Sequence, residues 1–89
     1  MSQSFSLTIT IPKHTIPTIV GKGGISIAKL REEHGVQVKF HDSDEDGPDT
    51  LVESVIEGNR NGVLKTQKII EDVVSEIVRV VLVTFLYSL

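Results

Sequence analysis

The chain is organised around Ile19-Val20-Gly21-Lys22-Gly23-Gly24-Ile25-Ser26-Ile27, a glycine loop between two short apolar segments that are compatible with helices. Three glycines in four residues remove the Cβ atoms that would keep a partner's backbone away, and glycine adopts backbone angles that strain other residues. The helix expected after Gly24 would point its free N–H groups and its positive dipole end at an anion. Lys22 adds a full charge at the tip. The loop therefore predicts close approach to a group such as a phosphate.

The spacing of these glycines excludes two common nucleotide-binding motifs. The chain has no Gly-x-x-x-x-Gly-Lys-Ser/Thr, and no glycine follows Gly23 three residues later to complete Gly-x-Gly-x-x-Gly. A bare Gly-x-x-Gly also occurs as a helix–helix turn without any ligand, and this alternative stays open from the loop alone.

Composition limits the function further. The 89 residues are enough for one domain with a modest core and too few for a two-lobed enzyme cleft. The absence of cysteine excludes disulfides and thiolate chemistry and favours a reduced compartment, cytoplasmic or nuclear. No signal-peptide pattern opens the chain. The three histidines have no metal-ligand spacing and no catalytic grouping stands out, so we expect no enzyme, metal or cofactor.

Charge is distributed unevenly along the chain. The net charge is −3, yet residues 1–40 hold five Lys/Arg against two acids, while residues 41–89 hold four against ten. The glycine loop lies in the basic half. Because the local field at a site steers a ligand, the overall negative charge does not exclude an anionic partner.

Hydrophobic periodicity predicts the element order. Alternation from Phe5 to Ile11 indicates a strand that Pro12 ends, and two helices follow over residues 13–20 and 25–34, the first tolerating Pro17 in its first turn. Strands are expected at residues 36–40 and 51–57, and a final helix follows a turn that offers Asn59 or Asn61 as N-cap. The order β-α-α-β-β-α predicts an α+β fold, a three-stranded antiparallel sheet covered on one face by three helices.

The segment from Ile16 to Leu30 resembles the signature of the KH (K homology) family, apolar-Gly-x-Ile-Ile-Gly-x-x-Gly-x-x-Ile, with Pro17 where glycine is usual. The start Ile11-Pro12-Lys13-His14 is similar to the repeats of vigilin-like proteins, which carry many such domains. The resemblance covers residues 5–78 and implies the eukaryotic type I fold, leaving 79–89 as an apolar C-terminal extension.

The resemblance also implies a binding site for single-stranded RNA or DNA. In the family the glycine loop packs against the sugar-phosphate backbone, and about four nucleotides lie in a groove between the two short helices and the second strand. The predicted contacts are Gly21, Lys22, Gly23, Gly24, Ile16, Ile19, Ile25, Lys29, Val38 and Lys39. The residues alone favour a place in the core for Val38, and for Ile16, Ile19 and Ile25 both core and groove stay open. For Lys29 and Lys39 a solvated charge is the competing interpretation, and Lys13, His14 and Arg31 are further candidates.

The acidic loop between the second and third strands contains a calcium-like pattern. Asp42, Asp44 and Asp46, followed by Gly47 and Glu53, match the spacing of an EF-hand loop. An EF-hand needs a helix on each side, whereas the flanking segments are predicted strands. We therefore interpret it as a solvated acidic loop that repels a nucleic acid on its side of the groove.

The tail after Ile77 is almost wholly apolar, and Arg79 interrupts it. It is too short to span a bilayer, so no membrane partner is expected. A β-branched run of this kind is compatible with an extended helix, a strand, a dimer contact or the edge of a longer protein. The leading hypothesis is a nucleic-acid-binding module, one of several in its parent protein. The alternative is a protein-association module, a homodimer formed through the first strand and the last helix.

Overall fold

Three strands form one antiparallel sheet in the structure, a computed structural model that describes residues 4–88. They are β1 (Phe5–Pro12), β2 (Val36–His41) and β3 (Leu51–Gly58), and β3 lies in the middle. Ile56 on β3 is opposite Leu7 on β1 and Val38 on β2. Paired residues share a face of the sheet, so these three side chains form one apolar layer, with Ile56 completely buried.

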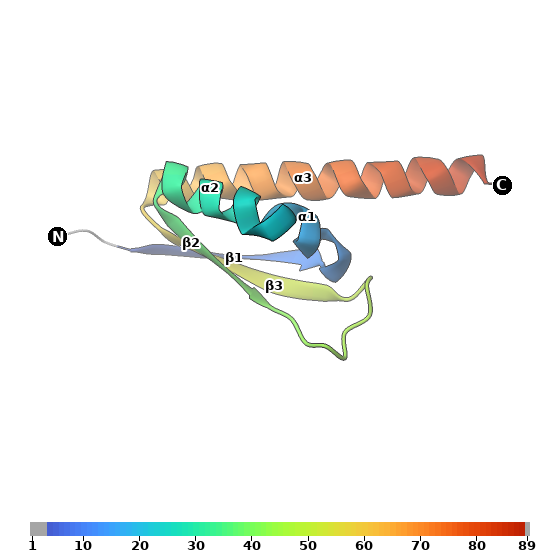
Figure 1. Cartoon of the computed structure of the whole chain (residues 1–89), viewed down its shortest axis with the longest axis horizontal. Coiled ribbons are helices and arrows are strands. Elements are labelled where there is room, and N and C mark those ends of the chain that lie inside the picture. The colour runs from blue at the N-terminus through green and yellow to red at the C-terminus, as the bar shows by residue number, and fades with distance from the viewer. Residues whose placement is uncertain (1–3, 89) are drawn as a thin grey trace.

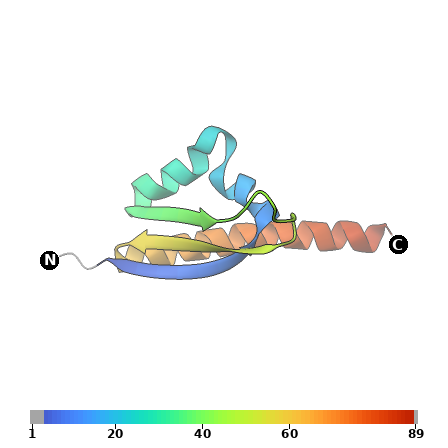
Figure 2. The same ribbon diagram turned by 90° about the horizontal axis from the view of Figure 1, so that it is seen from below.

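The helices cover that apolar face (Figure 1). The short α1 (Ile16–Val20) follows a 3₁₀ turn, α2 (Ile25–His34) comes after the glycine loop, and α3 (Arg60–Tyr87) is the long final helix. Seen from below, α2 lies along the β2 side of the sheet and α3 runs behind β1 and β3 (Figure 2). The core between the layers consists of Ile11, Ile19, Ile27, Val36, Val38, Val52, Ile56, Val63 and Ile70. The predicted fold class and element order are confirmed.

The corner between β1 and α1 explains how Pro17 is accommodated. Thr15 is fully buried, and its Oγ1 donates a hydrogen bond of 2.7 Å to the carbonyl of Pro12. Pro17 falls in the first turn of α1, where its missing N–H costs nothing. The expected single helix over residues 13–20 is in fact the 3₁₀ turn Lys13–Thr15 followed by α1.

Asn59 ties the end of α2 to the start of α3. Its side-chain oxygen accepts a 2.7 Å hydrogen bond from the N–H of Gly62, so Asn59, one of the two predicted candidates, is the N-cap. Its amide group also donates to the carbonyl of His34 at 3.1 Å. Gly62 is buried here, and a Cβ at this position would overlap that same carbonyl oxygen. The Asn59 side chain thus bonds to one free carbonyl at the end of α2 and to one free N–H at the start of α3.

The apolar tail is helical. Helix α3 continues without a break to Tyr87, and Figure 1 shows its C-terminal part projecting past the sheet. Of the alternatives that the sequence left open, the extended helix is the observed conformation.

The contact at Gly62 gives a stability prediction. We expect Gly62→Ala to lower the free energy of unfolding by about 1–3 kcal/mol, the usual cost of overpacking. Helix propensity alone predicts the opposite sign, since alanine is preferred to glycine by about 1 kcal/mol within a helix. Urea unfolding followed by circular dichroism measures the difference.

Gly47→Ala in the acidic loop is the control, because its Cβ would lie at an ordinary 3.7 Å from Thr50 Oγ1. Its unfolding free energy should change by less than about 0.5 kcal/mol. A Gly62→Ala variant as stable as the parent chain would contradict the packing described here.

Candidate functional site

The glycine loop adopts backbone angles that only glycine reaches without strain. Gly21 has φ 80° and ψ 168°, and Gly23 and Gly24 have φ of 64° and 78°. The N–H of Gly21 donates to the carbonyl of Pro17 at 2.9 Å, and that of Gly24 donates to the carbonyl of Gly21 at 3.0 Å. Between them, the N–H groups of Lys22 and Gly23 have no backbone acceptor within the described residues. The loop therefore offers two free donors.

The three glycines serve different purposes. A Cβ on Gly21 would lie 2.5 Å from Ser26 Oγ and 2.8 Å from Ser26 Cβ, so this glycine allows α1 and α2 to pack closely. A Cβ on Gly23 or Gly24 would meet nothing within 4 Å. These two positions face open space, where an incoming group can reach the backbone. The exposed Lys22 lies between them and Gly21.

The apolar residues predicted for the site divide into surface and core. Ile25, directly after the loop, is 70% exposed, and Ile16 is half-buried. Ile19 and Val38 are only 3% exposed and belong to the core. Ile19 and Val38 therefore support the site from beneath, and the expectation that they form its surface is not met in this conformation.

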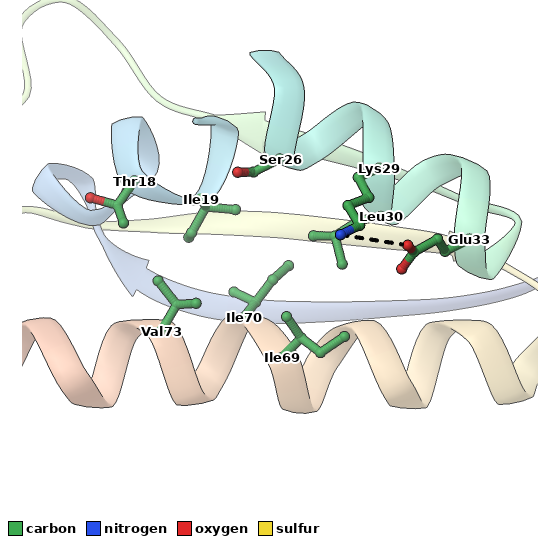
Figure 3. Close-up of a pocket in the computed structure, with 9 residues that line it drawn as sticks. All are labelled: Thr18, Ile19, Ser26, Lys29, Leu30, Glu33, Ile69, Ile70 and Val73. Carbon is green, nitrogen blue, oxygen red and sulfur yellow. Dashed lines mark ion pairs between the residues drawn. The ribbon is translucent and has the colours of Figure 1, made fainter. Parts of the chain in front are cut away.

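Two of the predicted basic residues are turned away from the site. Lys29 lies on the α3 side of α2, where its ammonium is 3.8 Å from the carboxylate of Glu33 (Figure 3). Lys39 follows the buried Val38, so strand alternation places it on the outer face of the sheet. Neither lies between α2 and β2, where the groove was predicted.

Arg31 and Ala28 do border that groove. The guanidinium of Arg31 reaches from α2 to the carbonyl of Val38 on β2, at 3.4 Å from Nη2. Ala28 lies one turn earlier on the same side of α2 and is exposed. The burial of Ile27 in the core shows which side of α2 faces β2, and Arg31 and Ala28 lie on that side. The sequence alone does not show which face of this helix is buried, so it could not place these two residues at the groove.

A separate cavity of about 320 Å³ lies between α1, α2 and α3. Figure 3 shows its apolar lining, with Ile70 and Val73 from α3 on one side and Leu30 from α2 on the other. Lys29 and Glu33 lie at its rim. The cavity is on the far side of α2 from β2. It therefore does not belong to the groove that Arg31 borders.

The acidic loop is attached to the 3₁₀ turn that precedes α1. The backbone N–H groups of Lys13 and His14 donate to the carbonyls of Thr50 and Pro48 at 2.9 and 3.0 Å, and the Lys13 ammonium donates to the carbonyl of Ser43. Lys13 is thus engaged within the fold. The flanking segments are strands β2 and β3, which differs from an EF-hand, and among residues 4–88 no cluster of three candidate metal ligands is found.

Comparison with known proteins finds both sequence and structural relatives. A family model described as "KH domain" matches residues 6–72. Vigilin of Gallus gallus is 33% identical over 80 residues, which is 83% of this chain and 6% of that protein. Protein SCP160 of Saccharomyces cerevisiae is 32% identical over 79 residues, 85% of this chain and 6% of that protein. The chain thus spans a small fraction of the curated relatives it matches.

Solved structures agree on the fold. The 13th KH type I domain from human vigilin superposes with a TM-score of 0.70 at 27% identity, covering 85% of this chain and 77% of that one. The first KH type I domain of the same protein gives 0.73 at 19% identity, covering 86% and 78%. The predicted type I arrangement is confirmed. Among residues 4–88, none of the helices combines the length and the hydropathy that crossing a bilayer requires.

The different roles of the glycines can be tested by a matched pair of variants. Gly21→Ala should lower the free energy of unfolding by about 2–4 kcal/mol, because it adds overpacking against Ser26 to backbone strain. Gly23→Ala, also at positive φ but with open space around its Cβ, should cost only about 1 kcal/mol. Equal losses in urea unfolding would show that Gly21 has no packing role.

Proposed function

This chain belongs to the KH domain family, and on that premise we propose that it binds single-stranded nucleic acid, with RNA as the natural ligand, through the Gly21–Gly24 loop and the groove between α2 and β2. The observation that carries the proposal is the open backbone at Gly23 and Gly24 beside the exposed Lys22. Bare backbone at the surface, next to a cation, suits the sugar-phosphate backbone of a nucleic acid.

The loop supplies three kinds of attraction for a phosphate. The N–H groups of Lys22 and Gly23 are free to donate hydrogen bonds, and charge-assisted bonds of this kind are stronger than neutral ones. The ten-residue α2 starts directly after the loop, so its positive dipole end faces the same direction. The Lys22 ammonium adds a full charge.

The groove beside the loop would accept the bases. Ile25 and Ile16 provide apolar surface, Ala28 leaves room for a base to approach α2, and the Arg31 guanidinium lies at the β2 border as a donor. The four aromatic residues of the chain, Phe5, Phe40, Phe85 and Tyr87, lie outside this set. Because base stacking on aromatic rings is worth about 1–3 kcal/mol per base, its absence predicts modest affinity for one domain.

The acidic loop restricts how the strand can lie. Its attachment to Lys13 and His14 keeps the carboxylates of residues 42–49 near the start of α1. Their repulsion disfavours extension of a nucleic acid toward that end and favours a short bound segment of about four nucleotides.

We also propose that the domain is one module of a longer protein that contains several KH domains. The curated relatives are far longer than this chain, and the structural relatives include the 13th and the 14th KH type I domains of human vigilin. Several weakly binding modules on one chain gain avidity from effective concentration. The proposed role is that of a binding module without catalysis, acting in the cytoplasm or nucleus.

The proposed site is tested by the double variant Lys22→Asp, Gly23→Asp. Two carboxylates at the loop should repel phosphates and lower the affinity for a short single-stranded RNA by at least about tenfold. The fold should remain, because Lys22 is exposed and a side chain on Gly23 meets no neighbour. Fluorescence anisotropy of a labelled RNA measures binding, and circular dichroism checks the fold.

The control is Asn61→Asp with Lys65→Asp, which changes the net charge by the same amount at exposed positions in the first turns of α3. These positions lie at the opposite end of the domain from the glycine loop (Figure 1). If both double variants lose the same affinity, binding depends on overall charge alone and the loop is not the site.

A further inference from the structure

The C-terminal part of α3 has no partner within the described part of the domain. The last fully buried residue of the helix is Ile70, and beyond Val78 it projects past the sheet in both views (Figures 1 and 2). The large apolar side chains there are between 45% and 87% exposed. They are Val80, Val81, Leu82, Val83, Phe85, Leu86 and Tyr87. A helix that is hydrophobic all round is normally buried.

This surface is at the upper limit of what a monomer usually exposes. Seven large apolar side chains that are about half exposed present on the order of 600 Å², the upper end of the largest patch on a typical monomeric protein. We propose that a second copy of this chain covers it, with the two α3 extensions packed antiparallel over residues 74–88.

The spacing of apolar residues supports a helix–helix seam. Val74, Val78, Val81 and Phe85 recur at intervals of four, three and four, the pattern of the core positions of a coiled coil. A hollow lies along one flank of this seam and shares Val74 and Val78 with it; it is lined by Val74, Ser75, Val78, Arg79, Leu82 and Val83. Residues at such spacing form the holes that a side chain from a facing helix enters. Phe85 of the second copy is the largest apolar side chain available to enter it.

The helix dipoles favour the antiparallel direction, because parallel packing would place the two negative C-terminal ends side by side. Arg79 is the only charged residue after Glu76, and it lies near the start of the extension. Arg79 already has Glu76 of its own helix at 3.8 Å, so it does not enter the seam as an isolated charge.

The area of such a contact fits a weak and reversible dimer. The fourteen helical residues 74–87 measure about 21 Å, and two helices packed over that length bury on the order of 1,000 Å² in total. This lies at the lower limit for a specific interface and predicts a dissociation constant on the order of 10 µM. The contact involves α3 alone, because the apolar face of β1 is already packed against the core.

Single cysteines can test the geometry, because the chain contains none. In the antiparallel pair the axis passes near residue 80, so Val81→Cys, on the seam and next to the axis, should form a disulfide-linked dimer in oxidised glutathione. Ser75→Cys should remain at least tenfold less cross-linked, because the two copies of residue 75 would lie about 15 Å apart, beyond disulfide reach. Non-reducing electrophoresis measures both. Efficient cross-linking at both positions would indicate a parallel pair or random collision and would overturn the proposal.

Sedimentation of the cysteine-free chain tests the dimer itself. The parent chain should be mostly dimeric at about 100 µM, while Val78→Glu with Phe85→Glu should be monomeric there, since both substitutions lie on the proposed seam. Both side chains are exposed, so the domain should still fold. A parent chain that remains monomeric at this concentration, or that associates as strongly with the two glutamates present, overturns the proposal. Monomeric chains bound to phosphatidylcholine vesicles would identify a lipid surface as the occupant and overturn it as well.

Discussion

Gly21 lies so close to Ser26 that no side chain fits between the end of α1 and the start of α2. This contact sets the angle between the two short helices, and the chain joining them has to turn with positive φ at Gly23 and Gly24. The turn leaves two N–H groups without backbone acceptors among the described residues and exposes bare backbone beside Lys22. The proposed binding surface is thus a consequence of how closely the two helices pack. A larger residue at Gly21 would separate the helices and disturb the site together with the fold.

Most of the regular elements were predictable because they have a clear local signal. Alternation of apolar and polar residues predicts β1 and β2, and Gly35 marks the end of α2. These signals need little help from tertiary contacts. The tail was ambiguous for a physical reason: β-branched residues suit a strand locally, and only the continuation of α3 from a well-capped start extends the helix through them.

The candidate site was predictable in its centre and less so at its edges. The glycine spacing identifies the loop directly, whereas the side of α2 on which a residue lies depends on what the helix packs against. Lys29 and Arg31 look equivalent in the sequence, yet Lys29 faces α3 and Arg31 reaches β2. Ile19 and Val38 have the apolar character expected of a groove, but burial places them under it. Local sequence cannot distinguish a core residue from a groove residue when both are aliphatic.

If the glycine loop and the Arg31 side of α2 form the binding surface, a titration of the ¹⁵N-labelled chain with a short single-stranded RNA of randomised sequence should reveal it residue by residue. The account predicts that the largest amide shifts occur at Lys22, Gly23, Ile25, Ala28 and Arg31, with smaller changes at residues facing the cavity between α2 and α3. Shifts confined to α3 beyond residue 78, or the absence of any saturable shift at the glycine loop, would contradict it.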